Sequence, residues 1–125
     1  MRKRSIILLG WLVVLLVACG DAGAGDPAET VEKYFEAKVA ADAEGLRQVL
    51  CSEMEANLER EVRTFDGVQG VRLEGMACTQ EGASSTVRCE GSIVALYGTE
   101  ETEFPLTAYR VVQEDGEWKW CGEAE

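Results

Sequence analysis

Apolar and polar residues follow a helical period in the first half of the chain and an alternating period in the second half. Spacings of three and four residues predict a helix that begins at Pro27, with Asp26 as its N-cap. A shorter helix is expected after Asp42, and a third after Ser52, where Ser52 and Glu55 match a capping box. The expected apolar stripes are Val31, Tyr34, Phe35 and Val39; Leu46, Val49 and Leu50; and Met54, Leu58, Val62 and Phe65.

The alternating half predicts four strands separated by turns. Their expected ranges are 68–78, 87–97, 103–113 and 117–121. Gly75 and Gly91 indicate bulges or strong bends in the first two strands, and Pro105 indicates an edge or a bulge in the third. Asp115-Gly116 has the sequence of a tight hairpin turn. Helices followed by an antiparallel meander predict an α+β fold, in which the N-terminal helices pack on a curved four-stranded sheet.

The N-terminal segment has the three parts of a secretory signal. Basic residues occupy positions 2–4, an apolar run spans Ile6–Val17, and small residues follow. The end of the apolar run, Leu16-Val17-Ala18-Cys19, resembles the lipobox of bacterial lipoproteins. That resemblance implies cleavage before Cys19 and attachment of lipid to its thiol.

We therefore expect a signal peptide at 1–18, a lipidated Cys19 with a flexible tether at 19–25, and a domain at 26–125. The lipid would hold the domain on a bacterial cell membrane or outer membrane, outside the cytoplasm. An ordinary cleaved signal and a retained anchor are the alternatives. An ordinary cleavage site prefers small residues at both positions of an A-x-A pattern, and Leu16 occupies one of them.

Composition narrows the range of functions. The formal net charge is −11, which argues against nucleic acid as a partner because phosphates require Lys and Arg. The chain contains no histidine, which removes the commonest general base, the Ser-His and Cys-His pairs and most zinc sites. Neither a metal nor another cofactor is expected.

The cysteine count predicts disulfides. Once Cys19 is assigned to lipid, four cysteines remain, and in an exported chain they are expected to form two disulfides in one of three pairings. Cys78 and Cys89 flank a plausible hairpin turn, which favours Cys78–Cys89 and leaves Cys51–Cys121. The spacings contain no C-x-x-C pattern, so a redox or metal site is not expected.

The order of elements resembles the nuclear transport factor 2-like superfamily, and more narrowly small bacterial lipoproteins of that fold. The runs 31–37, 41–46 and 111–121 carry the resemblance. It implies a cone-shaped domain whose interior forms a pocket. Enzymes of the superfamily, such as the ketosteroid isomerases, place Asp, His or Tyr residues inside the cone, and no matching Asp–His set is present here.

Aromatic residues of the second half are the candidates for a ligand pocket, with core and sheet packing as the alternative, which we favour for Trp118 and Trp120. They are Tyr97, Tyr109, Trp118 and Trp120. Acid–base chemistry would need a Tyr hydroxyl beside a buried Glu with a raised pKa. Glu74 and Glu90 lie inside predicted strands and are the acids to consider, with an outward-facing position as the alternative.

Three functions fit these observations. The first is a non-catalytic, membrane-anchored domain that binds a protein partner or a small ligand through the concave face of its sheet. The second is a small pocket enzyme, of isomerase or dehydratase type, that uses Tyr and Glu as acid and base. The third is a structural or inhibitory lipoprotein of an envelope complex.

Overall fold

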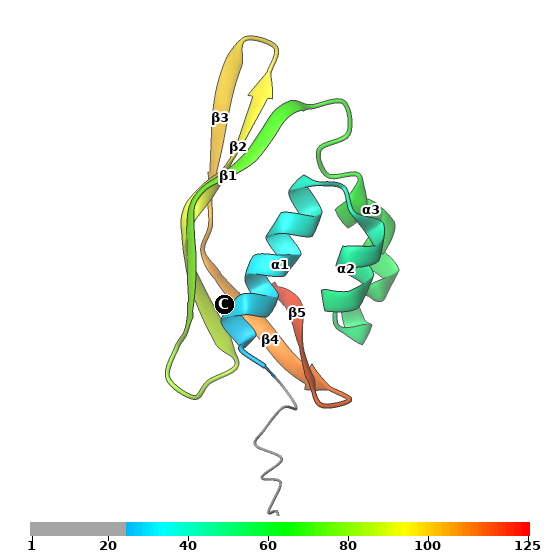
Figure 1. Ribbon diagram of the computed structural model, residues 1–125, viewed down its shortest axis with the longest axis vertical. Helices are drawn as coiled ribbons and strands as arrows, with labels where there is room; N and C mark the ends of the chain where they lie inside the picture. Colours follow the sequence, from blue (N-terminus) through cyan, green and yellow to red (C-terminus); the bar gives the residue numbers. More distant parts are fainter. Residues whose placement is uncertain (1–24) are drawn as a thin grey trace, which may run out of the picture.

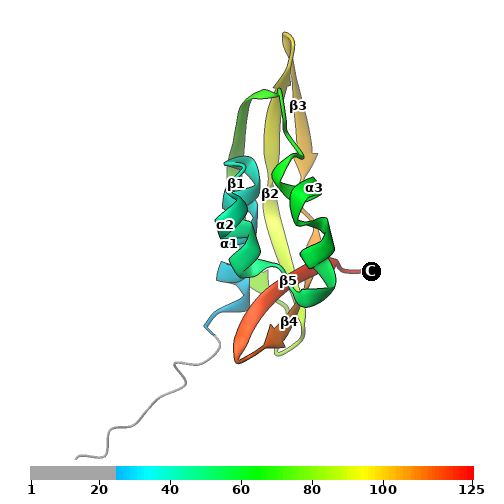
Figure 2. The same cartoon turned by 90° about the vertical axis from the view of Figure 1, so that its right-hand side faces the viewer.

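The computed structural model describes residues 25–125, in which helices cover one face of a twisted antiparallel sheet (Figures 1 and 2). The predicted signal peptide, Cys19 and most of the tether lie outside the described residues. The helical elements are α1 (Pro27–Val39), α2 (Ala43–Val49), the 3₁₀ helix η1 (Ser52–Asn57) and α3 (Leu58–Val62). The strands are β1 (Gln69–Gln80), β2 (Thr86–Tyr97), β3 (Glu100–Pro105), β4 (Ala108–Glu114) and β5 (Glu117–Glu123).

The first two helices form where the sequence predicts them. Asp26 caps α1 by accepting a hydrogen bond from the Ala28 N–H at 2.9 Å, and Pro27 is the first helical residue. Asp42 caps α2 by accepting from the Gly45 N–H at 3.0 Å. A side chain at position 45 would crowd this cap, because a Cβ there would lie 2.6 Å from Asp42 Oδ2.

The expected third helix is wrong in its first part. Residues from Ser52 onward form η1, a 3₁₀ helix, before the short α3 begins, and the capping box does not form. The Ser52 hydroxyl instead donates to Glu114 Oε2 at 2.6 Å, and the Ser52 N–H donates to Glu114 Oε1 at 2.9 Å. A partner 62 residues away therefore replaces the local cap.

The sheet has five strands rather than the predicted four, in the order β1-β2-β4-β5 with β3 also paired to β2. The expected third strand is divided at Leu106 and Thr107, directly after Pro105. Its two parts still follow β2, because the Leu106 N–H donates to Gly91 O and the Cys89 N–H donates to Thr107 O. The sequence identified the irregularity at Pro105 but not the break that it produces.

Bulges and turns follow their sequence signals. The β1–β2 register shifts between Glu74 and Ala77, at the predicted site of Gly75. In the β4–β5 hairpin, Asp115 and Gly116 both have positive φ, at 52° and 79°, as a tight primed turn requires. A single parallel bridge joins Leu50 to Trp120, so that the segment after α2 lies along β5.

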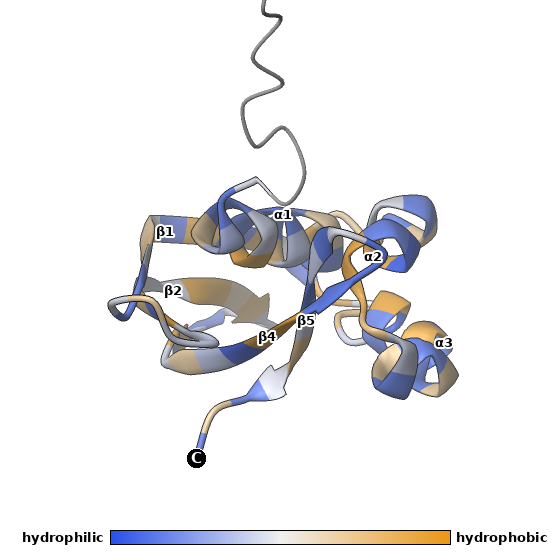
Figure 3. Cartoon of the chain, turned by 90° about the horizontal axis from the view of Figure 1, so that it is seen from below, coloured by the Kyte–Doolittle hydropathy of each residue, from blue (hydrophilic) through white to orange (hydrophobic). Residues whose placement is uncertain are grey.

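The core lies between α1 and the inner face of the sheet, and Figure 3 shows α1 over that face. Tyr34 and Phe35 face the sheet from α1. The ring of Tyr34 stacks on Trp120 with centroids 3.7 Å apart, and Phe35 meets Tyr109 edge to face at 4.9 Å. Each aromatic pair of this kind contributes about 0.5–1.5 kcal/mol beyond the burial of its area.

Two disulfides, Cys78–Cys89 and Cys51–Cys121, join the pairs that the sequence favoured. Cys78 and Cys89 lie directly opposite each other on β1 and β2. Cys51–Cys121 closes a separation of 70 residues and ties the end of the helical half to the last strand. In the chain-entropy model a loop of this length stabilises the fold by about 4 kcal/mol.

Gly91 is the residue in the sheet that tolerates a side chain least. Its φ is +93°, and a Cβ there would lie 2.5 Å from Glu74 O and 2.6 Å from the Gly75 carbonyl. Gly91→Ala should therefore lower the free energy of unfolding by about 2–4 kcal/mol in urea denaturation with the disulfides intact.

Gly98→Ala is the matched control for this substitution. Gly98 also has a positive φ, +65°, but no atom lies within 4 Å of its added Cβ. Its replacement should cost about 1 kcal/mol, the ordinary penalty for a left-handed residue. Equal losses in the two variants would mean that the close approach of β1 to β2 at Gly91 does not restrict the residue.

Candidate functional site

A buried polar cluster joins α1 to α3. Glu61, with 8% of its surface exposed, is the only buried charged residue in the part of the chain that the structure describes. Its Oε2 accepts a hydrogen bond from the Tyr34 hydroxyl at 2.5 Å and one from Lys38 Nζ at 2.7 Å. Lys38 Nζ also donates to the Tyr34 oxygen at 3.0 Å. We call Tyr34, Lys38 and Glu61 the buried triad.

Helix geometry explains how the triad forms. Tyr34 and Lys38 are four residues apart on α1 and therefore project from the same face. The stacked ring of Trp120 fixes the Tyr34 ring, and Lys38 Nζ lies 5.4 Å from the centre of that ring. Because both side chains are held by α1, the short α3 is anchored through Glu61 rather than by its own length.

Burial raises the pKa of Tyr34 far above its ordinary value of 10, and the hydrogen bond to Glu61 and the charge of that carboxylate raise it further. Tyr34 therefore keeps its proton and acts as a donor. The Lys38 ammonium, only 16% exposed at its side chain, balances the carboxylate charge. The three polar groups satisfy one another, which is the arrangement expected of a buried network that fixes packing.

The sequence contained a signal for this triad that the pattern analysis missed. Glu61 lies on the apolar stripe of α3, three residues after Leu58 and immediately before Val62. Lys38 lies on the stripe of α1 in the same way, four residues after Tyr34. Opposite charges on the apolar stripes of neighbouring helices indicate a buried ion pair, because a lone charge would be too costly there.

The acids considered from the sequence lie elsewhere. Glu74 and Glu90 are both exposed on the sheet. Glu74 is paired with Arg72, whose Nη2 also lies 3.1 Å from Glu101 Oε1, and these two carboxylates raise the pKa of Arg72. Neither acid faces a buried Tyr hydroxyl.

The four candidate pocket residues occupy three different places. Tyr109 and Trp120 are brought together in the core, with ring centroids 6.3 Å apart. Tyr97 ends β2 and is 45% exposed. Trp118 is half-buried and lines a surface groove beside the start of α1. Trp118 and Trp120 share one face of β5, as expected. The alternation of apolar and polar residues does not reveal which residues of that face are covered by a helix.

The hairpin of β2 and β3 projects beyond the helices in both Figure 1 and Figure 2. Tyr97 and Phe104, 41% exposed, are the exposed large apolar residues of the described chain, and their rings lie 6.4 Å apart. Phe65, which follows α3, lies 6.4 Å from Phe104. We call Phe65, Tyr97 and Phe104 the aromatic patch.

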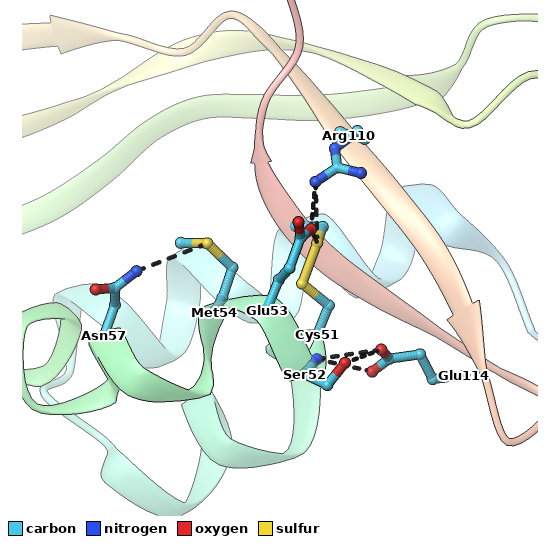
Figure 4. The surroundings of a disulfide bond; sticks show 8 residues. Cys51, Ser52, Glu53, Met54, Asn57, Arg110 and Glu114 are labelled. Atoms are coloured by element: carbon cyan, nitrogen blue, oxygen red, sulfur yellow. Dashed lines mark hydrogen bonds and ion pairs between the residues drawn. A yellow bond between two sulfur atoms is a disulfide. The ribbon is translucent and has the colours of Figure 1, made fainter.

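Figure 4 shows the surroundings of the Cys51–Cys121 disulfide. A Glu53 carboxylate oxygen and the two sulfurs lie within 4.8 Å of one another, a spacing that would suit a metal ion. Because both sulfurs are in a disulfide, they offer no thiolate to a metal. Glu53 instead pairs with Arg110 Nη2 at 2.7 Å, and this pair covers the disulfide.

Glu114 holds the same segment from its other side. Its carboxylate accepts from the Ser52 hydroxyl and N–H, and these two hydrogen bonds lower the pKa of Glu114. The residues around the disulfide therefore lock the segment after α2 against β4 and β5.

The comparisons with known proteins concern the fold. The sequence matches no protein-family model, and a search of curated proteins gave no significant match. Among solved structures, the chain is similar to an NTF2-like protein of unknown function in nutrient uptake from Rhodospirillum rubrum ATCC 11170. The TM-score is 0.50 at 18% identity, over 78% of this chain and 95% of that one. This likeness supports the nuclear transport factor 2-like fold and carries no statement on activity.

The raised pKa of Tyr34 makes stability depend on pH above 10. In the unfolded chain the phenol ionises near pH 10, whereas in the folded protein it stays protonated, so the contribution of Tyr34 is complete below pH 10 and is lost as the pH rises. Wild-type protein should lose up to about 1.4 kcal/mol per pH unit from this group. Tyr34→Phe should remove that slope in urea denaturation between pH 8 and 12.

The same substitution should cost about 1–2 kcal/mol at pH 8, because Glu61 loses a donor. Tyr97→Phe is the control, since Tyr97 is exposed and should leave both the stability and its pH dependence unchanged. If Tyr34→Phe keeps the wild-type slope above pH 10, the phenol is not held in its protonated form.

Proposed function

We propose that the protein is a lipid-anchored, extracytoplasmic binding domain without a catalytic role, and that the β2–β3 hairpin presents the aromatic patch to a protein partner. The lipobox-like sequence before Cys19 supports the anchor. The two disulfides agree with an exported chain, since disulfides persist in oxidising compartments. None of the helices in residues 25–125 is both long and apolar enough to cross a bilayer.

The exposure of the aromatic patch is the observation that carries the binding proposal. Aromatic residues are enriched at protein interfaces, where burying each ring contributes about 1.5–3 kcal/mol. Glu100, Glu101 and Glu103 of β3 are all exposed beside the patch. A partner that matches this surface has an apolar centre surrounded by Lys and Arg, because opposite charges favour association.

The cone shape implied by the resemblance to the nuclear transport factor 2-like superfamily is also part of this proposal. The shift in β1 at Gly75 and the close approach at Gly91 bend the sheet, which supports a curved inner face. We infer that this curvature directs the uncovered part of the inner face, with the aromatic patch, toward the partner. A structural or inhibitory role in an envelope complex would use the same surface.

A second candidate is an isomerase- or dehydratase-like pocket enzyme, and the buried Tyr34–Glu61 pair is the observation that favours it. Such an enzyme needs an acid and a base that exchange protons with a substrate near working pH. The raised pKa of Tyr34 makes it a weak acid, and Lys38 occupies the carboxylate that would act as the base. In residues 25–125, two surface grooves lie along α1, and the triad lines neither of them. We therefore prefer the binding role.

The anchor predicts the mass of the protein purified from its native membrane. The chain should begin at Cys19, carry attached acyl chains, and gain four protons on reduction of its two disulfides. Cys19→Ala provides the control, since it should abolish the lipid mass and leave the four-proton change intact. An unmodified N-terminus would refute the anchor, and unchanged mass on reduction would refute the disulfides.

The binding surface predicts site-specific crosslinking. A photoreactive amino acid in place of Phe104 in the full chain, expressed in its own membrane, should give one adduct of defined mass. The same group at Gln113, exposed on β4, should not give that adduct. Tyr97→Ser combined with the group at 104 should reduce its yield at least about threefold, because it removes one apolar contact. Equal adducts at both positions, or none at 104, would exclude the hairpin as the binding surface.

A further inference from the structure

A groove of about 420 Å³ is lined by residues of α1, α2 and β5. These parts of the three elements lie at the end of the molecule away from the β2–β3 hairpin (Figure 1). The first turns of α1, the last residues of α2 and the start of β5 form its walls. A second groove of about 280 Å³ lies along α1 and α2 and shares Lys33, Gln48 and Val49 with the first. The two together form an open track, which suits an elongated ligand better than a small compact one.

Trp118, which is half-buried, contributes an aromatic side chain to the wall of this groove. The face of an indole ring carries negative electrostatic potential, which attracts the weakly positive C–H groups of a saturated ring. The residue after Trp118 connects the β4–β5 hairpin to α2, because Lys119 Nζ donates to Gln48 O. Lys119 also pairs with Glu117 at 3.2 Å. The Lys119 side chain is 17% exposed, whereas its partner Glu117 is 67% exposed.

Uncommitted polar groups surround the aromatic surface. Thr30 offers a hydroxyl, and Gln48 is exposed and offers a side-chain amide that both donates and accepts. Lys33 and Glu29 lie 3.7 Å apart with 62% and 61% of their side chains exposed, so their pairing is weak. Donors and acceptors are thus available on both α1 and α2 where these helices line the groove.

The charges of the groove select among ligand classes. The carboxylates of Asp26, Glu29 and Glu117 and the ammonium groups of Lys33 and Lys119 all line the groove. The carboxylates would repel a phosphate, and the ammonium groups would repel a polyamine. A neutral ligand rich in hydroxyl groups uses both, because each hydroxyl donates to a carboxylate and accepts from an ammonium or amide group.

We propose that this track binds a neutral oligosaccharide, with Trp118 stacking on a sugar ring and Glu29, Thr30, Lys33 and Gln48 hydrogen-bonding to its hydroxyl groups. The proposal is independent of the partner surface, which lies at the opposite end of the molecule.

The test uses the full chain in detergent, with chitotetraose and maltotetraose as probes in separate titrations followed by calorimetry and tryptophan fluorescence. At least one sugar should saturate the protein below about 10 mM and change its fluorescence. Lys33→Ala and Gln48→Ala replace exposed residues and should each weaken binding about five- to tenfold. Trp118→Ala should weaken it more than tenfold.

Gln69→Ala is the control, because Gln69 is an exposed glutamine on β1, outside the track. It should leave the affinity for the sugar unchanged. No saturation by either sugar would overturn the proposal, as would binding that survives all three groove substitutions or tighter binding of inorganic phosphate or spermidine. Loss of binding at Phe104 variants alone would assign the sugar to the hairpin instead and also overturn it.

Discussion

Trp120 lies at the point where the sheet, α1 and the segment after α2 meet. Its ring stacks on Tyr34, its carbonyl accepts from the Cys51 N–H at 2.9 Å, and the next residue forms the disulfide to Cys51. Its buried indole Nε1 has no partner among the described residues, which costs about 1–3 kcal/mol. Burial and stacking of the ring offset this cost. Because Tyr34 also holds Glu61, the position of α3 depends on the same stack.

The elements that could be predicted are those whose caps and turns are formed by residues close together in the sequence. The caps at Asp26 and Asp42 and the turn at Asp115-Gly116 were predictable, because each depends on neighbours within three residues. The capping box at Ser52 failed for the opposite reason: Glu114, distant in sequence, accepts from the Ser52 N–H that Glu55 would have capped, and also from the Ser52 hydroxyl. A pattern read within a short window of sequence cannot show that a distant residue such as Glu114 accepts the same hydrogen bond.

The residues of the buried triad were not predictable from the pattern. A Tyr hydroxyl beside a buried Glu was named only as what acid–base chemistry would need, with the strand residues Glu74 and Glu90 as the acids to consider, whereas the pair that forms is Tyr34 and Glu61. A charged residue on a helical stripe looks like an interruption of the apolar pattern until its partner is known. The aromatic residues illustrate the same limit, since alternation assigns Trp118 and Trp120 to one face, whereas only the position of α1 separates a groove residue from a core residue.

The middle of the molecule differs from its two ends in how its polar groups are hydrogen-bonded. In the centre, the triad and the Cys51–Cys121 segment use their donors and acceptors on one another, which leaves little free chemistry and much rigidity. At the β2–β3 end the sheet extends beyond the helices and leaves Tyr97 and Phe104 exposed, and at the other end α1, α2 and β5 leave a groove lined by charged side chains and Trp118. A centre held by this network fixes the distance between the ends, so that binding at either of the two proposed surfaces would need little further ordering.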